Sequence, residues 1–114
     1  MKDDRIYLFH IQDAIKDILE YTKEGRGAFL KDKKTQDAVI RNLEIIGEAT
    51  KKLSNPLRLK YPNIKWKKIA GMRDKLIHEY FGVNFELVWD VIDQDLVGFL
   101  SDIKLIINDL QSNS

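Results

Sequence analysis

Apolar residues recur every three or four positions along most of the chain, which is the spacing of one face of an α-helix. No segment offers the strict apolar–polar alternation of a β-strand as a competing pattern. The pattern therefore predicts an all-α protein. Its first helix is expected over about Asp4 to Thr22, with an apolar stripe at Tyr7, Ile11, Ala14, Ile18 and Tyr21.

A second apolar stripe begins after Thr35, whose side chain suits an N-cap, and continues until Asn55-Pro56 stops it. Between the first two helices, Gly25, Gly27 and a lysine cluster predict a loop. Gly47 lies in the middle of the second helix, where glycine costs about 1 kcal/mol relative to alanine. It therefore indicates close approach by another element, although a tolerated substitution remains an alternative.

Residues 57–64 form a connector with room for one short helical turn. A third helix is predicted from near Lys65 to just before Gly82, a residue suited to ending a helix. Asn84 is the expected N-cap of a fourth helix of roughly 40 Å at 1.5 Å per residue, whose apolar stripe is interrupted at Asp95. Together these helices predict an antiparallel four-helix bundle, with room for one short extra helix.

The composition narrows the class of protein further. At 114 residues the chain fits one domain, expected to span 1–114. There is no cysteine, and neither His10 nor His78 has carboxylates at helical spacing that could complete a zinc site, so no metal and no cofactor are expected. Charges interrupt the N-terminal stretch, so we expect neither a signal peptide nor a membrane span, and a cytoplasmic protein.

The net charge of +1 hides a strong asymmetry. Residues 51–75 carry nine Lys or Arg and one acid, whereas residues 76–114 carry one base and seven acids. A basic segment of this kind attracts a polyanion such as RNA, but it can also be a solvated face that keeps the protein soluble. The candidate RNA contacts are Lys65, Lys67, Lys68 and Lys75.

The basic segment leads into Arg73-Asp74-Lys75-Leu76-Ile77-His78-Glu79-Tyr80. This residue set suits phosphate chemistry, because Arg73 offers a fork of donors, His78 can move a proton near neutral pH, and Tyr80 offers a hydroxyl. Asp74 lies four residues before His78, where it can form a helical ion pair or orient the imidazole. The spacing alone is a weak signal, since it recurs by chance in many helices.

A helical wheel at about 100° per residue separates two faces of the third helix. Ile69, Met72, Leu76 and Tyr80 form an apolar arc expected to face the core, with Arg73 at its edge. His78 falls about 140° from Arg73 and shares a second face, the polar stripe, with Lys67, Gly71 and Asp74. Taken alone, this position is more typical of a surface histidine than of a catalytic one.

Several segments together resemble the HEPN family, and more narrowly the HepT toxins that pair with a small MNT-type nucleotidyltransferase. They are the R-x4-H-x-Y motif, Ala38–Ala49 with its Ile-Gly-Glu-Ala run, Ile64–Arg73, and Val88-Trp89. The resemblance implies a homodimer whose motif helices meet, so that two Arg–His sets line one cleft.

The same resemblance implies an activity, namely that of a metal-independent endoribonuclease toxin in a toxin–antitoxin pair. Arg73 and His78 are then the catalytic residues, with Asp74 and Tyr80 in support. Tyr80 matches the tyrosine on which the nucleotidyltransferase antitoxin places AMP. Two alternatives stay open: a non-catalytic subunit that presents nucleotide or substrate to a nucleotidyltransferase, and a purely structural helical dimer.

Four further residues have simpler expected roles. Trp66 and Trp89 are expected to be core or interface anchors rather than platforms for base stacking. Glu48 is expected to be an exposed helix acid, with a role near the active groove left open. His10 is expected to be structural or exposed.

Overall fold

The computed structural model describes residues 3–78 and 83–112, and for residues 73–78 it describes only the helical backbone. No strand occurs among the described residues, so the predicted all-α fold is confirmed. The helices are α1 (Asp4–Tyr21), α2 (Arg26–Lys31), α3 (Lys33–Lys52), α4 (Asn55–Lys60), α5 (Trp66–His78), α6 (Phe85–Asp90), the π-helix η2 (Val91–Leu96) and α7 (Val97–Ser112).

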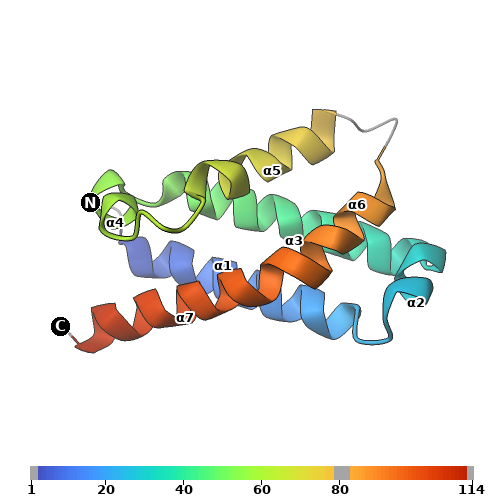
Figure 1. Cartoon of the computed structure of the whole chain (residues 1–114), viewed down its shortest axis with the longest axis horizontal. Coiled ribbons are helices and arrows are strands. Elements are labelled where there is room, and N and C mark those ends of the chain that lie inside the picture. The colour runs from blue at the N-terminus through green and yellow to red at the C-terminus, as the bar shows by residue number, and fades with distance from the viewer. Residues whose placement is uncertain (1–2, 79–82, 113–114) are drawn as a thin grey trace.

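Four long rods form the bundle, and each runs antiparallel to the one before it (Figure 1). Helix α3 packs along α1 on one side and along α5 on the other, while α7 packs against α1. The rod made by α6, η2 and α7 is the fourth helix of the prediction. The predicted antiparallel arrangement is therefore confirmed.

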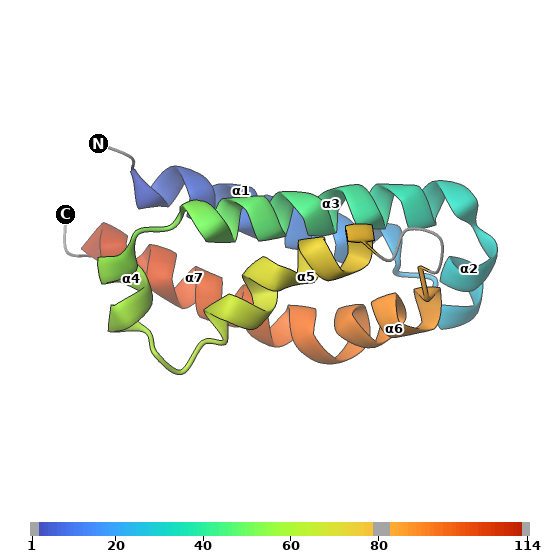
Figure 2. The same ribbon diagram turned by 90° about the horizontal axis from the view of Figure 1, so that it is seen from above.

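Short helices lie at the two ends of the bundle, α2 at one and α4 at the other (Figure 2). Helix α4 is the short turn anticipated in the connector. Helix α2 corrects the prediction of a loop at Gly25 and Gly27. Gly25 has a φ of 96°, the left-handed conformation that glycine adopts readily, and it stands as the N-cap of α2.

The core is built from the predicted apolar stripes of α1, α3 and the fourth rod, but Tyr21, predicted in the stripe of α1, is 46 % exposed. Within the described residues, no helix is both long enough and apolar enough to cross a membrane. Gly47 is buried on α3. The apolar core residues with 0 % exposure are Leu8, Ile11, Ile15, Ile18, Val39, Leu43, Ile46, Val88, Ile103 and Ile106.

The start of α3 also differs from the prediction, because Asp32 and not Thr35 caps the helix. The Asp32 carboxylate accepts a hydrogen bond from the backbone N–H of Lys34 at 3.1 Å. Thr35 instead donates its hydroxyl to Asp32 Oδ2 at 2.8 Å, and this bond lowers the pKa of Asp32. Aspartate at the earlier position satisfies a free N–H of the first turn, so the helix begins at Lys33.

The fourth rod begins where predicted, since Asn84 Oδ1 accepts from the backbone N–H groups of Glu86 and Leu87 at 3.0 and 3.3 Å. The π-helix η2 lies where Asp95 interrupts the apolar stripe. Leu96, four residues after Ile92, takes the core position at 2 % exposure, and Asp95 is exposed.

Candidate functional site

The part of the sequence motif from Arg73 to His78 forms the C-terminal end of α5. Arg73, Asp74, Lys75 and His78 lie in its described helical backbone, which puts Arg73 and His78 roughly 7.5 Å apart along the helix axis. Their side-chain contacts, and Tyr80 altogether, lie outside the described residues. The catalytic, supporting and modification roles of these residues therefore stay predictions.

The first turn of α5 is firmly attached to the rest of the bundle. Trp66 is 7 % exposed, its indole N–H donates to the carbonyl of Tyr61 at 3.1 Å, and its ring meets Phe99 edge-on with centroids 6.2 Å apart. The Tyr61 hydroxyl donates to Asp109 Oδ2 at 2.8 Å, and burial together with this bond raises the pKa of Tyr61. These contacts hold the start of the motif helix against α7.

Both tryptophans pack as the sequence predicts. Trp66 belongs to the core cluster, and Trp89 is half-buried with its ring 5.8 Å from that of Phe29. Neither is a free platform for stacking a base.

The two faces predicted for α5 are recovered only in part in its described half. Ile69 and Met72 are partly buried against the core, although the wheel did not single out Trp66 and Ala70, which are more deeply buried. On the polar stripe, Lys67 is exposed, and a Cβ built on Gly71 would meet nothing within 4 Å. The described members of the stripe thus face away from the core.

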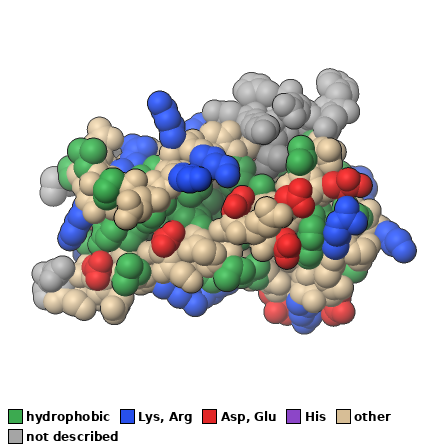
Figure 3. Space-filling view, in the orientation of Figure 1, with side chains coloured by type: hydrophobic (Ala, Val, Ile, Leu, Met, Phe, Trp, Pro, Cys, Tyr) green, Lys and Arg blue, Asp and Glu red, His purple; other side chains and the backbone are tan. Residues whose placement is uncertain are grey.

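A groove of about 530 Å³ opens between α5 and the η2–α7 rod, and we refer to it as the α5–η2 groove. In Figure 3, apolar surface lies in the hollow between basic side chains on one side and acidic side chains on the other. One wall carries Lys65, just before α5, and Lys67 and Lys68 from its first turn; the other carries Gln94, Asp95 and Asp102. The apolar floor includes Ile64, Ile69, Met72, Leu96 and Phe99.

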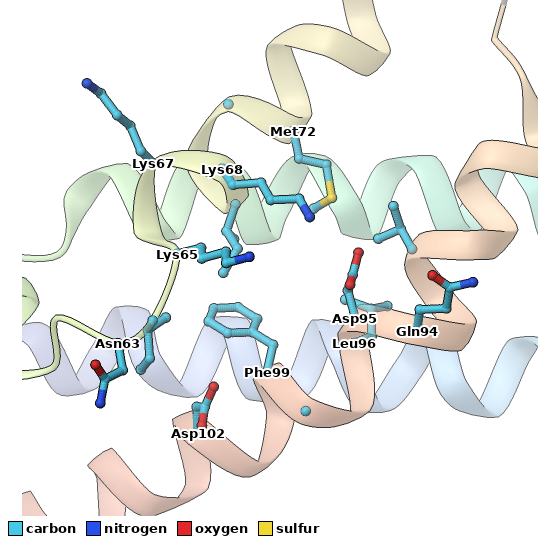
Figure 4. A pocket seen from close by; sticks show the side chains of 15 residues that line it. Asn63, Lys65, Lys67, Lys68, Met72, Gln94, Asp95, Leu96, Phe99 and Asp102 are labelled. Atoms are coloured by element: carbon cyan, nitrogen blue, oxygen red, sulfur yellow. The ribbon is translucent and has the colours of Figure 1, made fainter.

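The lysines of this groove differ in direction. Lys65 and Lys68 extend over the floor, whereas Lys67 points away from it (Figure 4). All three are exposed, as expected for RNA contacts, while the side chain of the fourth candidate, Lys75, lies outside the described set. Their role in RNA binding remains a prediction.

Residues of the acidic wall were not identified as site candidates from the sequence. The one available signal was Asp95, a charged residue in an otherwise apolar stripe. Helical periodicity alone could not place it beside the lysines, because the pairing of α5 with the fourth rod is a tertiary feature.

Glu48 and His10 lie elsewhere, at a hollow of about 420 Å³ between α1 and α3. His10 is exposed, as expected, and its ring meets Tyr7 edge-on with centroids 6.3 Å apart. Glu48 is half-buried rather than exposed, and neither residue lines the α5–η2 groove.

Comparison with known proteins identifies the family of this chain. The family described as "Ribonuclease HepT-like" matches residues 11–109. The chain is 47% identical over 111 residues to a Methanocaldococcus jannaschii protein named "Putative RNase", covering 96% of this chain and 92% of the relative. It is 44% identical over 108 residues to a "Putative RNase" of Caldanaerobacter subterraneus, covering 94% and 96%.

A Thermococcus cleftensis protein named "Probable ribonuclease HepT" is 50% identical over 91 residues, covering 79% of this chain and 83% of the relative. No solved structure matches. The family match spans most of the chain and includes the whole of α5, and the relatives match over nearly their full length. The resemblance inferred from the sequence is confirmed, and the chain belongs to the HepT-like family of ribonucleases.

Proposed function

We propose that this protein is a metal-independent endoribonuclease toxin of a HEPN/MNT toxin–antitoxin pair, acting on cytoplasmic RNA. The observation that carries the proposal is the ribonuclease family match over residues 11–109, which includes the Arg73–His78 segment of α5. The exposed lysines in the first turn of that helix support it, because they supply positive charge beside the motif.

In the proposed mechanism, His78 takes the proton of the ribose 2′-hydroxyl as general base. The 2′ oxygen attacks the neighbouring phosphorus, the bond to the 5′ oxygen breaks, and that oxygen leaves with a proton from solvent. The guanidinium of Arg73 stabilises the negative charge that grows on the phosphate oxygens. Asp74 orients the imidazole, and the products are a 2′,3′-cyclic phosphate and a 5′-hydroxyl.

The proposed assembly has two kinds of partner. A second copy of the chain completes the cleft, and an MNT-type nucleotidyltransferase acts as antitoxin by placing AMP on Tyr80. The adenylyl group adds a phosphate charge and a large base seven residues along the chain from Arg73. It would thereby occupy the cleft and compete with the substrate phosphate.

Expression of the chain alone tests the nuclease proposal directly. Wild-type protein is expected to arrest growth and to fragment total RNA into pieces with cyclic phosphate ends, whereas His78→Ala is expected to do neither. Electrophoresis of total RNA, with end-group analysis, provides the measurement. Intact RNA in cells that contain folded wild-type protein would favour the non-catalytic subunit instead.

Tyr80→Phe tests the proposed control of the toxin. After co-expression with the cognate nucleotidyltransferase, mass spectrometry should find one or more AMP groups on the wild-type peptide that contains Tyr80, and none on the Tyr80→Phe peptide. Tyr21→Phe is the matched control, because Tyr21 is exposed on α1. AMP found only on another residue would refute the assignment while leaving the nuclease proposal intact.

A further inference from the structure

The charged walls of the α5–η2 groove do not pair with each other. Among the described residues, neither its lysines nor Asp95 and Asp102 form an ion pair or hydrogen bond, although charges elsewhere do so, such as Arg5 with Asp3 at 3.0 Å. Opposed charges without a protein partner, on two sides of an apolar floor, suit a ligand that is itself anionic at one end and rich in hydrogen-bond donors at the other.

A nucleotide has this distribution of groups. Its phosphate fits the lysine wall, its base fits the apolar floor, and the ribose hydroxyls and base amino groups can donate to the acidic wall. A volume of about 530 Å³ lies within the usual range of small-ligand sites, so it can hold one nucleotide. A docked protein helix, with a diameter of roughly 10 Å, would call for a longer channel.

Part of the acidic wall lies in the π-helical turn. Asp95 and Gln94 of η2 stand at the groove rim, while Leu96 beside them is buried (Figure 4). Such turns cost helix regularity and are frequent at functional sites. Gly98 follows on the same wall, and a Cβ built there would meet nothing within 4 Å, so the groove is open at this point.

The groove lies next to the proposed catalytic residues along the same helix. Lys68 precedes Arg73 by five residues, roughly 7.5 Å along the axis, which is about one nucleotide of an extended single strand. On the helical wheel, the mean direction of Lys65, Lys68 and Met72 lies roughly 120° from the mean direction of the polar stripe. Lys67 and Gly71 of the stripe also line the groove, so a second copy seated on the stripe borders it, and RNA would enter from the side of Lys65 and Lys68.

From these observations we infer that the α5–η2 groove binds one unpaired nucleotide of the RNA next to the scissile phosphate and selects its base. The inference rests on the proposed ribonuclease function and adds a specificity subsite to it. Asp95 can only accept hydrogen bonds, so it favours bases with an exocyclic amino group, namely adenine, cytosine or guanine, over uracil, which has none.

The test uses single-stranded RNA oligonucleotides that differ only in the base beside the cleavage site. Wild-type protein is expected to cleave the adenine and cytosine versions with kcat/KM about tenfold above the uracil version. Asp95→Asn should remove this difference, because an amide also donates to the uracil carbonyl. The substitution is isosteric and lies on an exposed side chain.

Gly98→Met fills the groove from its open side and should lower kcat/KM on the adenine and cytosine RNAs to about the uracil level. Its fold should persist, since methionine is the better helix former and the site is empty. Gly27→Met is the matched control, because a Cβ at Gly27 of α2 also meets nothing within 4 Å. Unchanged base preference in both Asp95→Asn and Gly98→Met would overturn the inference.

A second readout separates the subsite from the nuclease proposal. Fluorescence anisotropy with oligonucleotides that carry a 2′-deoxy sugar at the cleavage site measures base preference without cleavage. Preference that is lost in Gly98→Met and kept in Gly27→Met would support the groove even if wild-type protein cuts no RNA. If Gly98→Met instead becomes a monomer in sedimentation, the groove is a contact between copies of the chain, and the nucleotide assignment fails.

Discussion

His78→Ala is expected to lower the rate of RNA cleavage by the purified protein by about 10²- to 10⁴-fold, the usual contribution of a general base. Arg73→Ala is expected to cost about 10²- to 10³-fold, because the phosphate charge then loses its donors. Arg73→Lys should also be impaired, since a point charge cannot copy the guanidinium fork. Initial rates on a labelled oligonucleotide, with helix content checked by circular dichroism, provide the measurement.

His10→Ala is the matched control for this series. His10 is the other histidine of the chain, it is exposed, and it lies on α1 away from the α5–η2 groove, so its loss should leave the rate unchanged. EDTA should not matter either, because the proposed mechanism uses only side chains. Full activity of His78→Ala, or activity lost in EDTA and restored by a divalent ion, would refute the mechanism.

The long helices could be predicted because their signals are local. The stripe of α1 and the Asn84 cap each depend on residues within a few positions of one another, and the structure has both. The R-x4-H-x-Y motif is local too, and together with the family resemblance it is enough to propose Arg73 and His78 as catalytic residues. The contacts of Arg73 and His78 with neighbouring helices depend on tertiary packing. The sequence pattern does not predict these contacts.

The sequence pattern did not predict features that depend on competition between two possible caps or on tertiary packing. Glycines 25 and 27 favour a loop, yet Gly25 can stand just before a helix in a positive-φ conformation, and Phe29 of α2 is then buried at 2 % exposure. Asp32 caps α3 in place of Thr35 because its carboxylate accepts a hydrogen bond from the backbone N–H of Lys34 in the first turn. Near Asp95, where the helix forms a π-turn, the core holds Leu96. Tertiary packing of the bundle determines this choice, so the sequence pattern does not predict it.

Gly71→Met is expected to weaken a homodimer formed through α5. Helix α5 lies at the edge of the bundle (Figure 1), its polar stripe carries no large apolar side chain, and Gly71 leaves open space where another helix can approach closely. If two copies cross antiparallel near Gly71, Lys67 of each meets the partner's Asp74, so the contact is self-complementary. Overpacking by about 1–3 kcal/mol corresponds to a rise in the dissociation constant of roughly 5- to 150-fold.

Sedimentation of the protein without RNA measures this dissociation constant, with Gly98→Met as the matched control. Both glycines line the α5–η2 groove and both have empty space around a built Cβ, but only Gly71 belongs to the polar stripe. Gly98→Met should therefore stay dimeric, whereas Gly71→Met should dissociate and lose cleavage at the same protein concentrations, because the proposed cleft needs an Arg73–His78 set from each copy. A wild-type protein that is monomeric at micromolar concentration and still cleaves RNA would show that one copy suffices, and the two-fold cleft would have to be abandoned.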